Sequence, residues 1–207
     1  MPIILNIETS STNCSVSLSN NNKLIDCLEK DSPNYSHSQK LHSFISELME
    51  KNNISFKDLD AVSIGIGPGS YTGLRIGLSA AKGICYALDI PLISVSSLEN
   101  MVSNIEFEGV IISTIDARRD EVYSCVFDKD KKVLREELPE IINSKSYINY
   151  SKTDKVLIVG NGQQKCKEII DFNKNFNWNI NIQKPSATNM DNIAYKKFEL
   201  NDFEDIA

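Results

Sequence analysis

A glycine-rich segment, Gly65–Arg75, is the strongest candidate for chemistry in the sequence. An apolar run that predicts a buried strand precedes it, and a run with helical periodicity follows it. Such a loop presents backbone N–H groups beside a helix N-terminus, where anions bind. Gly67, Gly69 and Gly73 are spaced one residue too far for the dinucleotide fingerprint, and no Lys-Ser/Thr pair completes a P-loop. Gly67 and Gly69 are therefore candidates for phosphate binding or, alternatively, parts of a tight turn that needs positive φ.

Two carboxylates occupy comparable places in the two halves of the chain. Glu8, followed by Thr9 and Ser10, ends the first predicted strand, and Asp116 ends the first predicted strand of the second half. Carboxylates and hydroxyls that face one cleft from duplicated halves could hold a magnesium nucleotide. Taken singly, each carboxylate is equally well explained as an acidic residue in a turn.

The arginines and histidines indicate which other binding or catalytic sites the chain could form. Arg75, Arg118 and Arg119 stand out because lysines dominate the 22 basic residues, and a guanidinium suits phosphates, although surface salt bridges remain the default. His37 and His42 lie about 140° apart on a helix, so they cannot readily clamp one metal, and solvent-facing side chains are favoured. Neither histidine accompanies a nucleophile elbow. The sequence therefore predicts no metal site and no catalytic residue.

The composition indicates an ordinary globular chain. It has 207 residues with 28 acidic and 22 basic side chains, a net charge of −6 and 41% hydrophobic residues. This excludes the disordered classes and argues against wrapping nucleic acid unaided, because that binding depends on lysines and arginines. Five widely spaced cysteines, no long apolar run and no signal sequence after Met1 favour a soluble, reduced, cytoplasmic protein with no membrane contact.

Apolar periodicity predicts two halves with the pattern βββ-α-β-α, which indicates a duplicated α/β fold. In the first half we expect strands over Ile3–Ile7, around Val16 and Leu18, and over Leu24–Leu28, Ala61–Ile66 and Pro91–Val95, with helices over Tyr35–Asn53, Thr72–Leu88 and Leu98–Val102. In the second half we expect strands over Val110–Ile115, Glu121–Phe127, Val133–Leu138, Val156–Val159 and Ile180–Gln183, with helices over Ser146–Tyr150, Gln163–Asp171 and Asp191–Phe198. The predicted domains are residues 1–102 and 103–207, and the last helix, about 186–207, could pack back on the first lobe.

A stripe of small residues marks the predicted helix Thr72–Leu88. Gly73, Gly77 and Ala81 recur at i, i+4 and i+8. Glycine inside a helix costs about 1 kcal/mol relative to alanine, so the stripe needs a packing reason. Close seating on the chain's own sheet is one explanation, and a helix–helix seam with another subunit is the other.

Several motifs together resemble the TsaB family, also called YeaZ. They are Ile7–Ser10, Cys14–Val16, Gly67–Arg75 and Asp116–Tyr123. The resemblance covers about the first 125 residues and becomes thin beyond Gly160–Gly162. Glu8 stands where many members of the family have Asp, and the longer side chain would displace a bound cation.

The resemblance implies the actin/hexokinase/Hsp70-like (ASKHA) fold of two duplicated βββαβα lobes. It implies a role in forming threonylcarbamoyladenosine beside the anticodon of tRNAs that read codons beginning with A. In the family, the larger paralogue TsaD transfers the group with a metal held by an H-x-x-x-H helix, a pattern that this chain lacks. The implied role is a non-catalytic partner of TsaD. An ATP-dependent small-molecule kinase or ATPase of the same fold is the alternative, and a peptidase has little support.

The resemblance also implies partners and a pairing surface. We expect a heterodimer with TsaD, a TsaE-type ATPase in the larger complex, a homodimer of the isolated chain, tRNA contact through the complex, and no cofactor except Mg-ATP or ADP at the subunit junction. The pairing surface would use the first two long helices, through Leu41, Phe44, Ile45, Thr72, Gly73, Ile76, Gly77, Ala80 and Ala81. The nucleotide candidates are Glu8, Thr9, Ser10, Gly67, Gly69, Arg75, Asp116 and Arg118.

Overall fold

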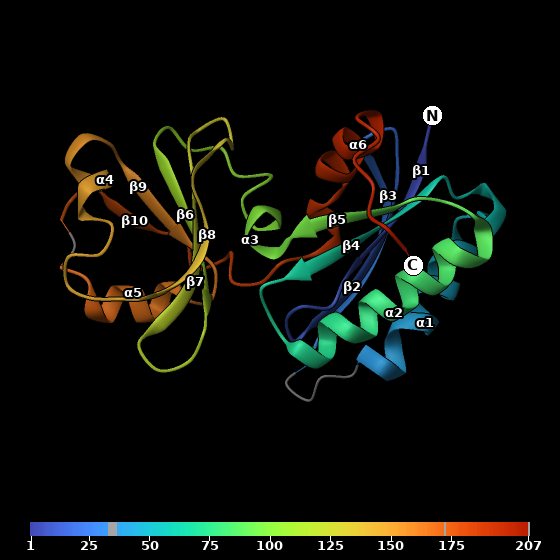
Figure 1. Cartoon of the computed structure of the whole chain (residues 1–207), viewed down its shortest axis with the longest axis horizontal. Helices are drawn as coiled ribbons and strands as arrows, with labels where there is room; N and C mark the ends of the chain where they lie inside the picture. The colour runs from blue at the N-terminus through green and yellow to red at the C-terminus, as the bar shows by residue number, and fades with distance from the viewer. Residues whose placement is uncertain (33–36, 172, 207) are drawn as a thin grey trace. The chain divides into compact units, whose positions relative to one another are not determined.

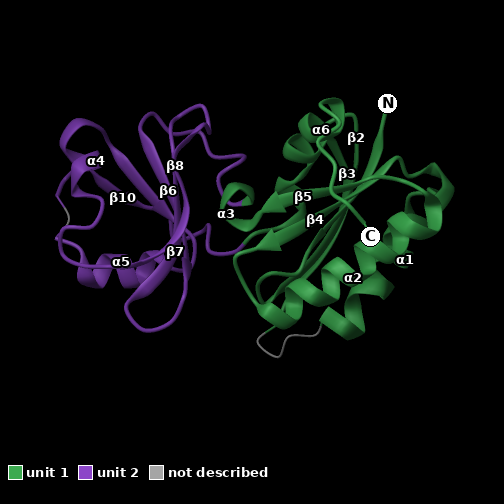
Figure 2. Cartoon of the chain, in the orientation of Figure 1, with its two compact units in different colours: residues 1–100, 185–207 green, residues 101–184 purple. Residues whose placement is uncertain are grey.

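The computed structural model describes residues 1–32, 37–171 and 173–206. The chain forms two compact units, shown in different colours in Figure 2. Unit 1 comprises Met1–Asn100 and Pro185–Ala207, and unit 2 comprises Met101–Lys184. The chain therefore leaves unit 1 once and returns to it, and the region of the last predicted helix is part of unit 1.

Unit 1 is a five-stranded mixed sheet with helices on both faces (Figure 1). The sheet order is β3-β2-β1-β4-β5, in which β1, β2 and β3 are antiparallel neighbours and β4 and β5 extend β1 in parallel. Its elements are β1 (Ile3–Glu8), β2 (Asn13–Asn20), β3 (Lys23–Asp31), α1 (His37–Lys51), a 3-10 turn (Phe56–Asp58), β4 (Ala61–Gly67), α2 (Tyr71–Leu88), β5 (Leu92–Ser96), α3 (Ser97–Asn100), a second 3-10 turn (Ala187–Asn189) and α6 (Asp191–Glu199).

The two faces of this sheet differ in chemistry. Side chains alternate along a strand, so Leu5 and Ile7 of β1 face α1 and α2 and are fully buried with Leu41 of α1. On the opposite face the strands carry a ladder of polar side chains, which are all buried: Asn6, Ser15, Ser17, Ser19 and Ser63. Unit 1 therefore needs a polar element to cover that face.

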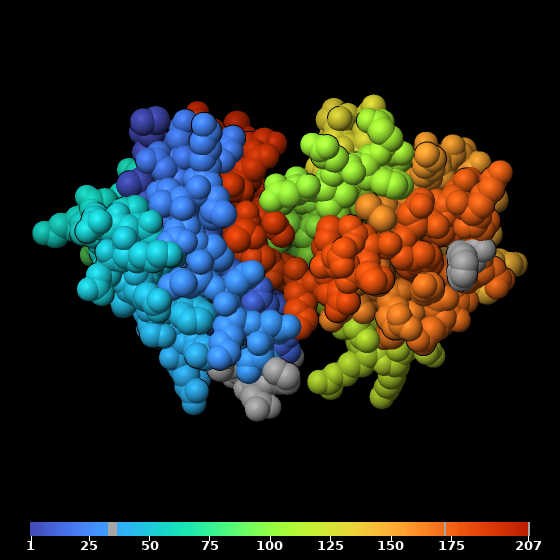
Figure 3. Space-filling view, turned by 180° about the vertical axis from the view of Figure 1, so that it is seen from behind, coloured from blue at the N-terminus to red at the C-terminus, as the bar shows by residue number. Residues whose placement is uncertain are grey.

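The returning C-terminal segment supplies this cover. The Ser17 hydroxyl donates to the Ala187 carbonyl (2.9 Å), and the Ala187 N–H donates to the Ser15 hydroxyl (3.0 Å). The Asn100 amide and the backbone of Ser186 exchange two further hydrogen bonds of 2.9 and 3.0 Å. In Figure 3 the red-orange residues of this segment lie directly beside the blue residues of β2 and β3. Hydrogen bonds and two small apolar clusters, which include Ala187, Ile193 and Ala194, hold this part of the chain against the sheet.

Unit 2 repeats the strand order of unit 1. Its sheet order, β10-β9-β6-β7-β8, has the antiparallel series β6, β7, β8 and the parallel series β6, β9, β10. Its elements are β6 (Val110–Asp116), β7 (Glu121–Phe127), β8 (Val133–Ile141), α4 (Ile148–Thr153), β9 (Val156–Val159), α5 (Gln163–Ile169) and β10 (Phe176–Trp178). The predicted duplication of a βββαβα unit is confirmed.

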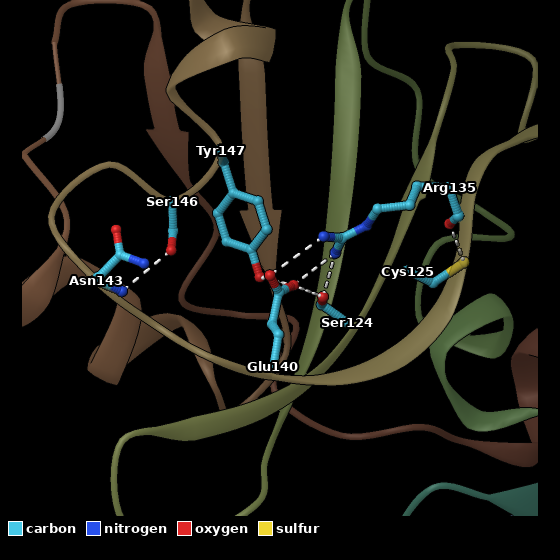
Figure 4. Close-up of polar contacts among 7 residues, drawn as sticks. All are labelled: Ser124, Cys125, Arg135, Glu140, Asn143, Ser146 and Tyr147. Atoms are coloured by element: carbon cyan, nitrogen blue, oxygen red, sulfur yellow. Dashed lines mark hydrogen bonds and ion pairs between the residues drawn. The ribbon is translucent and has the colours of Figure 1, made fainter.

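A polar cluster holds the edge of the sheet in unit 2 (Figure 4). The Arg135 guanidinium donates to both carboxylate oxygens of Glu140, at 2.6 and 3.2 Å. The Tyr147 hydroxyl donates to Glu140 Oε1 (2.8 Å), and the Ser124 hydroxyl is a further partner of the same oxygen. The four side chains tie β7 and β8 to the residue that precedes α4.

Several predicted elements differ from the structure in type or bounds. Residues 180–183 form no strand, since 180 and 181 lie in a turn, and the last strand is β10, which pairs in parallel with Val156–Ile158. The Asn179 side chain accepts the N–H of Asn181 (3.1 Å), and this local bond favours a turn over a strand. The helix α5 ends at Ile169, and the expected start of the first long helix at Tyr35 lies outside the described residues.

Candidate functional site

The turn after β1 and the N-terminus of α2 fit closely together in unit 1. The Ser70 N–H donates to the Ser10 carbonyl (2.6 Å), and the Thr9 hydroxyl donates to the Gly73 carbonyl (2.8 Å). Ser70 also caps α2, because its hydroxyl accepts the Gly73 N–H (3.3 Å). The turn is therefore the seat on which the first turns of α2 rest.

Two of the glycines of α2, Gly73 and Gly77, are required by this seat. A Cβ at Gly73 would overlap the Thr9 carbonyl oxygen, and a Cβ at Gly77 would overlap the Thr9 hydroxyl oxygen. A Cβ at Gly69 would overlap the Ser10 carbonyl oxygen. The small-residue stripe thus admits the chain's own backbone, and its interpretation as a seam for a foreign backbone is wrong for Gly73 and Gly77.

Glu8 lies beneath this seat and does not reach solvent. Its exposed fraction is 0%, and its Oε1 accepts the Ser10 N–H at 2.6 Å. Gly65 of β4 packs against the carboxyl group, and a Cβ there would overlap Oε2. Burial is the main influence on this group and raises the pKa of Glu8.

Asp116 is exposed, but its own unit occupies one of its carboxylate oxygens. Oδ1 accepts the Lys165 ammonium (2.7 Å) and the Arg118 N–H (2.6 Å). Burial raises the pKa of Asp116, but the hydrogen bonds from Lys165 and Arg118 outweigh burial and lower it. The Arg118 and Arg119 side chains are exposed on the same turn, where both residues have positive φ, 70° and 45°.

Within its own unit, each of the two carboxylates has contacts that compete with a magnesium ion. The Glu8 carboxyl is enclosed by its own strand, turn and Gly65, and Asp116 is neutralised by Lys165. The loop N–H of Ser70 is used by Ser10, and Gly67 has a positive φ of 98°. The tight-turn interpretation of Gly67 is therefore supported. Among the described residues, no group of three or more potential ligands is placed to hold a metal ion.

The predicted pairing residues divide into a buried set and an outward set. Leu41, Ile45, Ala80 and Ala81 belong to the apolar core of unit 1. Thr72 is exposed and Phe44 and Ile76 are half-buried, so these three retain surface for a partner. An open groove of about 610 Å³ lies along α1 and α2 and is lined by Ser38, His42, Tyr71, Thr72, Arg75, Ile76, Ser79 and Ala80.

A second, apolar hollow on the other flank of α2 was not predicted. It has a volume of about 170 Å³ and is lined by Gly65, Ile66, Tyr71, Leu74, Arg75 and Leu78. Tyr71 and Arg75 line both hollows, and the guanidinium carbon lies 4.0 Å from the centroid of the tyrosine ring. A tyrosine four residues before an arginine on a helix is a signal that could have indicated this cation–π pair.

The prediction that both histidines face solvent is wrong for His37. His37 is buried, and its Nε2 lies 2.8 Å from the Ser11 carbonyl oxygen, next to the seat of α2. Burial lowers the pKa of His37, and the hydrogen bond to Ser11 partly opposes this effect. His42 is exposed and lines the groove, as predicted.

Two units that repeat one βββαβα topology define a protein of the actin/hexokinase/Hsp70-like fold. The structure is similar to YeaZ from Pseudomonas aeruginosa, with a TM-score of 0.87 at 21% identity over 100% of this chain and 96% of that chain. It is also similar to the ethanolamine utilization protein EutJ from Carboxydothermus hydrogenoformans, with a TM-score of 0.54 at 9% identity over 93% and 90% of the two chains.

Sequence comparisons identify the family. The family model for TsaD, tRNA N6-adenosine threonylcarbamoyltransferase, matches residues 33–207. The tRNA threonylcarbamoyladenosine biosynthesis protein TsaB of Bacillus subtilis is 36% identical over 50% of this chain and 46% of its own length. TsaB of Buchnera aphidicola subsp. Baizongia pistaciae is 31% identical over 78% of this chain and 76% of its own length. The chain belongs to the TsaB family.

The matches leave part of the relatives unaligned. The chain spans about half the length of the first curated relatives that it matches, for example 46% of the Bacillus subtilis protein and 56% of the Escherichia coli protein. The names of these relatives concern threonylcarbamoyladenosine biosynthesis, so the small-molecule kinase alternative is not favoured. In the described part of the chain, no helix combines the length and the apolar character that crossing a membrane requires.

Proposed function

We propose that this chain is a non-catalytic, cytoplasmic partner of the catalytic paralogue TsaD in the formation of threonylcarbamoyladenosine in tRNA. The observation that carries the proposal is the open groove along α1 and α2 in a member of the TsaB family. The described residues offer no metal cluster for transfer chemistry. A role in supporting another subunit requires no metal cluster of its own.

The groove offers a partner both apolar area and fixed geometry. Ile76 presents partly exposed apolar surface, and Thr72 presents a hydroxyl one turn earlier on the same face of α2. The hydrogen bond from the Thr9 hydroxyl to the Gly73 carbonyl fixes α2 to the turn after β1. A preorganised helix face loses little conformational entropy on binding, which favours affinity.

Charge substitution in the groove tests this proposal. Ile76→Asp should weaken copurification with the catalytic paralogue at least about tenfold, because a buried unpaired charge at an interface costs more than 1.4 kcal/mol. The same variant should fail to restore threonylcarbamoyladenosine in a bacterial strain that lacks its own TsaB. Leu134→Asp, at a side chain that is 52% exposed in unit 2, is the matched control. Normal binding and modification with Ile76→Asp would contradict the proposal.

The assembly of the isolated chain uses the same groove in this proposal. We expect a homodimer that the catalytic paralogue displaces, a TsaE-type ATPase that joins the larger complex, and tRNA that binds through that complex. Light scattering should then show a dimer for the unmodified chain and a monomer for Ile76→Asp. If both proteins are monomers, the proposed homodimer is contradicted. The pairing with TsaD is tested separately by the copurification experiment.

Nucleotide binding belongs to the junction with the partner rather than to this chain alone. Glu8 is enclosed and Asp116 is paired, whereas the Arg75 and Arg118 side chains are exposed and suited to phosphate. Calorimetry should detect no binding of Mg-ATP or ADP to the isolated chain. Binding should appear with the TsaD complex and weaken with Arg118→Ala. Tight binding and hydrolysis by the isolated chain would restore the kinase alternative.

A further inference from the structure

We propose that Glu8 is kept as a neutral carboxylic acid and positions the N-terminus of α2, in place of the cation-binding role that its place in the fold implies. This inference concerns unit 1 by itself and does not depend on the proposed function. It rests on the packing around the carboxyl group, on the charges near it and on the contacts of the turn that it supports.

The carboxyl group is enclosed on every side by its own unit. Its exposed fraction is 0%, Oε1 accepts the Ser10 N–H at 2.6 Å, and Oε2 is buried with no hydrogen-bond partner among the described residues. Gly65 of β4 closes the space next to Oε2, where even a methyl group would overlap the oxygen. No room remains for a hydrated cation at this carboxyl group.

Within the part of the chain that the structure describes, no opposite charge compensates this group. The elements around the turn carry titratable side chains, among them Cys14 on β2, Glu29, Lys30 and Asp31 on β3, His37, Lys40 and His42 on α1, Tyr71, Arg75 and Lys82 on α2, and Glu99 on α3. None of them exerts a charge effect on Glu8, whose favourable partners are the hydrogen bonds from Ser10 and Thr9. An ionised carboxylate that is buried without a counter-charge is strongly unfavourable, and proteins respond by neutralising it. Burial accordingly raises the pKa of Glu8.

The neutral acid supports the seat of α2. Glu8 Oε1 fixes the N–H of Ser10, and the carbonyl of Ser10 accepts the N–H of Ser70 at the cap of α2 (2.6 Å). The Ser97 hydroxyl donates to the Ser10 hydroxyl (2.9 Å) and ties α3 to the same turn. Ionisation of Glu8 would draw water toward Oε2 and separate β4 from the turn, so the first turns of α2 would lose their support.

The dependence of unfolding on pH tests this proposal. Because the pKa of Glu8 is raised in the folded state, the folded protein binds the extra proton, and stability is lost as pH rises from the ordinary value of 4.5 toward the raised value. Glu8→Gln keeps the shape and cannot ionise. Over that range, the unfolding equilibrium constant of the unmodified chain should rise tenfold per pH unit relative to that of Glu8→Gln. The protection factors of the Ser70 and Leu74 amides, which are corrected for the intrinsic rise of exchange with pH, should fall over the same range in the unmodified chain alone.

A matched control and a direct measurement complete the test. Glu29→Gln changes an exposed carboxylate whose pKa is lowered by hydrogen bonds from Ser186, Asn13 and Ser15, although partial desolvation opposes them. The difference in stability between Glu29→Gln and the unmodified chain should change with pH in the range below 4.5. This change should have the opposite sign to that seen with Glu8→Gln. Infrared spectra of the unmodified chain at pH 7 should contain the carbonyl band of a buried carboxylic acid, and Glu8→Gln should lack it. A flat difference between Glu8→Gln and the unmodified chain above pH 4.5, or spectra with only ionised carboxylates at pH 7, would overturn the proposal. The spectrum decides the question even if Glu8→Gln does not fold.

Discussion

Unit 1 contains a fully buried glutamate, Glu8, and unit 2 a partly buried one, Glu140, and the two are stabilised in opposite ways. In unit 1, Glu8 has no counter-charge among the described residues, and burial raises its pKa. In unit 2, burial also opposes ionisation of Glu140, but hydrogen bonds from Arg135, Ser124 and Tyr147, together with the charge of Arg135, outweigh burial and lower its pKa. One topology therefore accommodates both a neutral and an ionised buried carboxyl group, and the neighbouring side chains decide which form is present.

This difference gives the two carboxyl groups opposite responses to pH. The lowered pKa of Glu140 means that its contribution to stability is present above 4.5 and is lost as pH falls through the folded value. The raised pKa of Glu8 means that its contribution is present below 4.5 and is lost as pH rises through the folded value. His37 adds an acid limb to unit 1, because burial lowers its pKa below 6.5 and protonation on acidification opposes folding.

The largest expected effect comes from overfilling the seat above Glu8. Gly73→Ala places a Cβ on the Thr9 carbonyl oxygen, which is backbone and cannot move aside. We expect a loss of about 3 kcal/mol from the free energy of unfolding, at the upper end for overpacking. Urea denaturation monitored by circular dichroism measures it. An unchanged midpoint would show that the seat is loose and that the partner surface can extend to this face.

Removal of the counter-charge in unit 2 should make Glu140 resemble Glu8. Arg135→Met leaves the Glu140 carboxylate buried without its ion pair, in a site where both side chains are about a quarter or less exposed. We expect a loss of about 2 to 3 kcal/mol at pH 7, reduced from the cost in a dry interior because of this exposure. The loss should shrink as pH falls, because protonation neutralises Glu140. A loss independent of pH would contradict the assignment of an ionised Glu140.

Removal of one neutral donor from the same cluster should have a smaller effect. Tyr147→Phe deletes the hydroxyl that donates to Glu140 Oε1 at 2.8 Å and keeps the ring in the core of unit 2. We expect a loss of about 1.5 kcal/mol, typical of a hydrogen bond to a charged group. Chemical denaturation measures this loss. The control is Tyr150→Phe, at a partly buried tyrosine of the same core. Equal losses in the two variants would assign no energy to the bond with Glu140.

The smallest effect should come from a glycine of α2 that faces away from the seat. At Gly83 an added Cβ would meet no atom of the described residues within 4 Å. Gly83→Ala should stabilise the chain by about 0.5 to 1 kcal/mol, because alanine favours a helix and restricts the unfolded chain. Thermal unfolding of Gly83→Ala next to Gly73→Ala measures how far the two positions differ. A destabilised Gly83→Ala would show that this part of α2 is covered by a second copy of the chain.

Local patterns in the amino-acid sequence predict much of the fold. The alternation of Leu5 and Ile7 with a polar residue predicts β1, and the asparagines at the first hairpin adopt positive φ, 49° for Asn21 and 65° for Asn22, as such a turn requires. The asparagine-rich stretch near Ile180 misled the same approach, because side-chain bonds to the backbone compete with strand pairing there.

The candidate site was harder to predict than the fold. A stripe of small residues shows that a backbone approaches closely, but it does not show whose backbone, and at Gly73 it is the chain's own Thr9. Glu8 ends a strand in the sequence like any exposed acid, and only the tertiary packing of Gly65 reveals its enclosure. Apolar periodicity identifies the side of α2 that packs on the sheet. It gives no information about the exposed sides of α2, where the groove and the Tyr71–Arg75 pair lie.

The serine ladder on the outer face of the first sheet has a consequence for biosynthesis. Residues 1–100 emerge from the ribosome long before Ser186 and Ala187, which finally cover Ser15 and Ser17. Until then this face remains in water, where apolar strands would promote aggregation of the nascent chain, and its apolar part includes Ile4, Ala61, Ile93 and Val95. Water can solvate the hydroxyl and amide groups of this face until the C-terminal segment has been synthesised and replaces it. Translation can therefore proceed through the whole of unit 2 before the first sheet is covered.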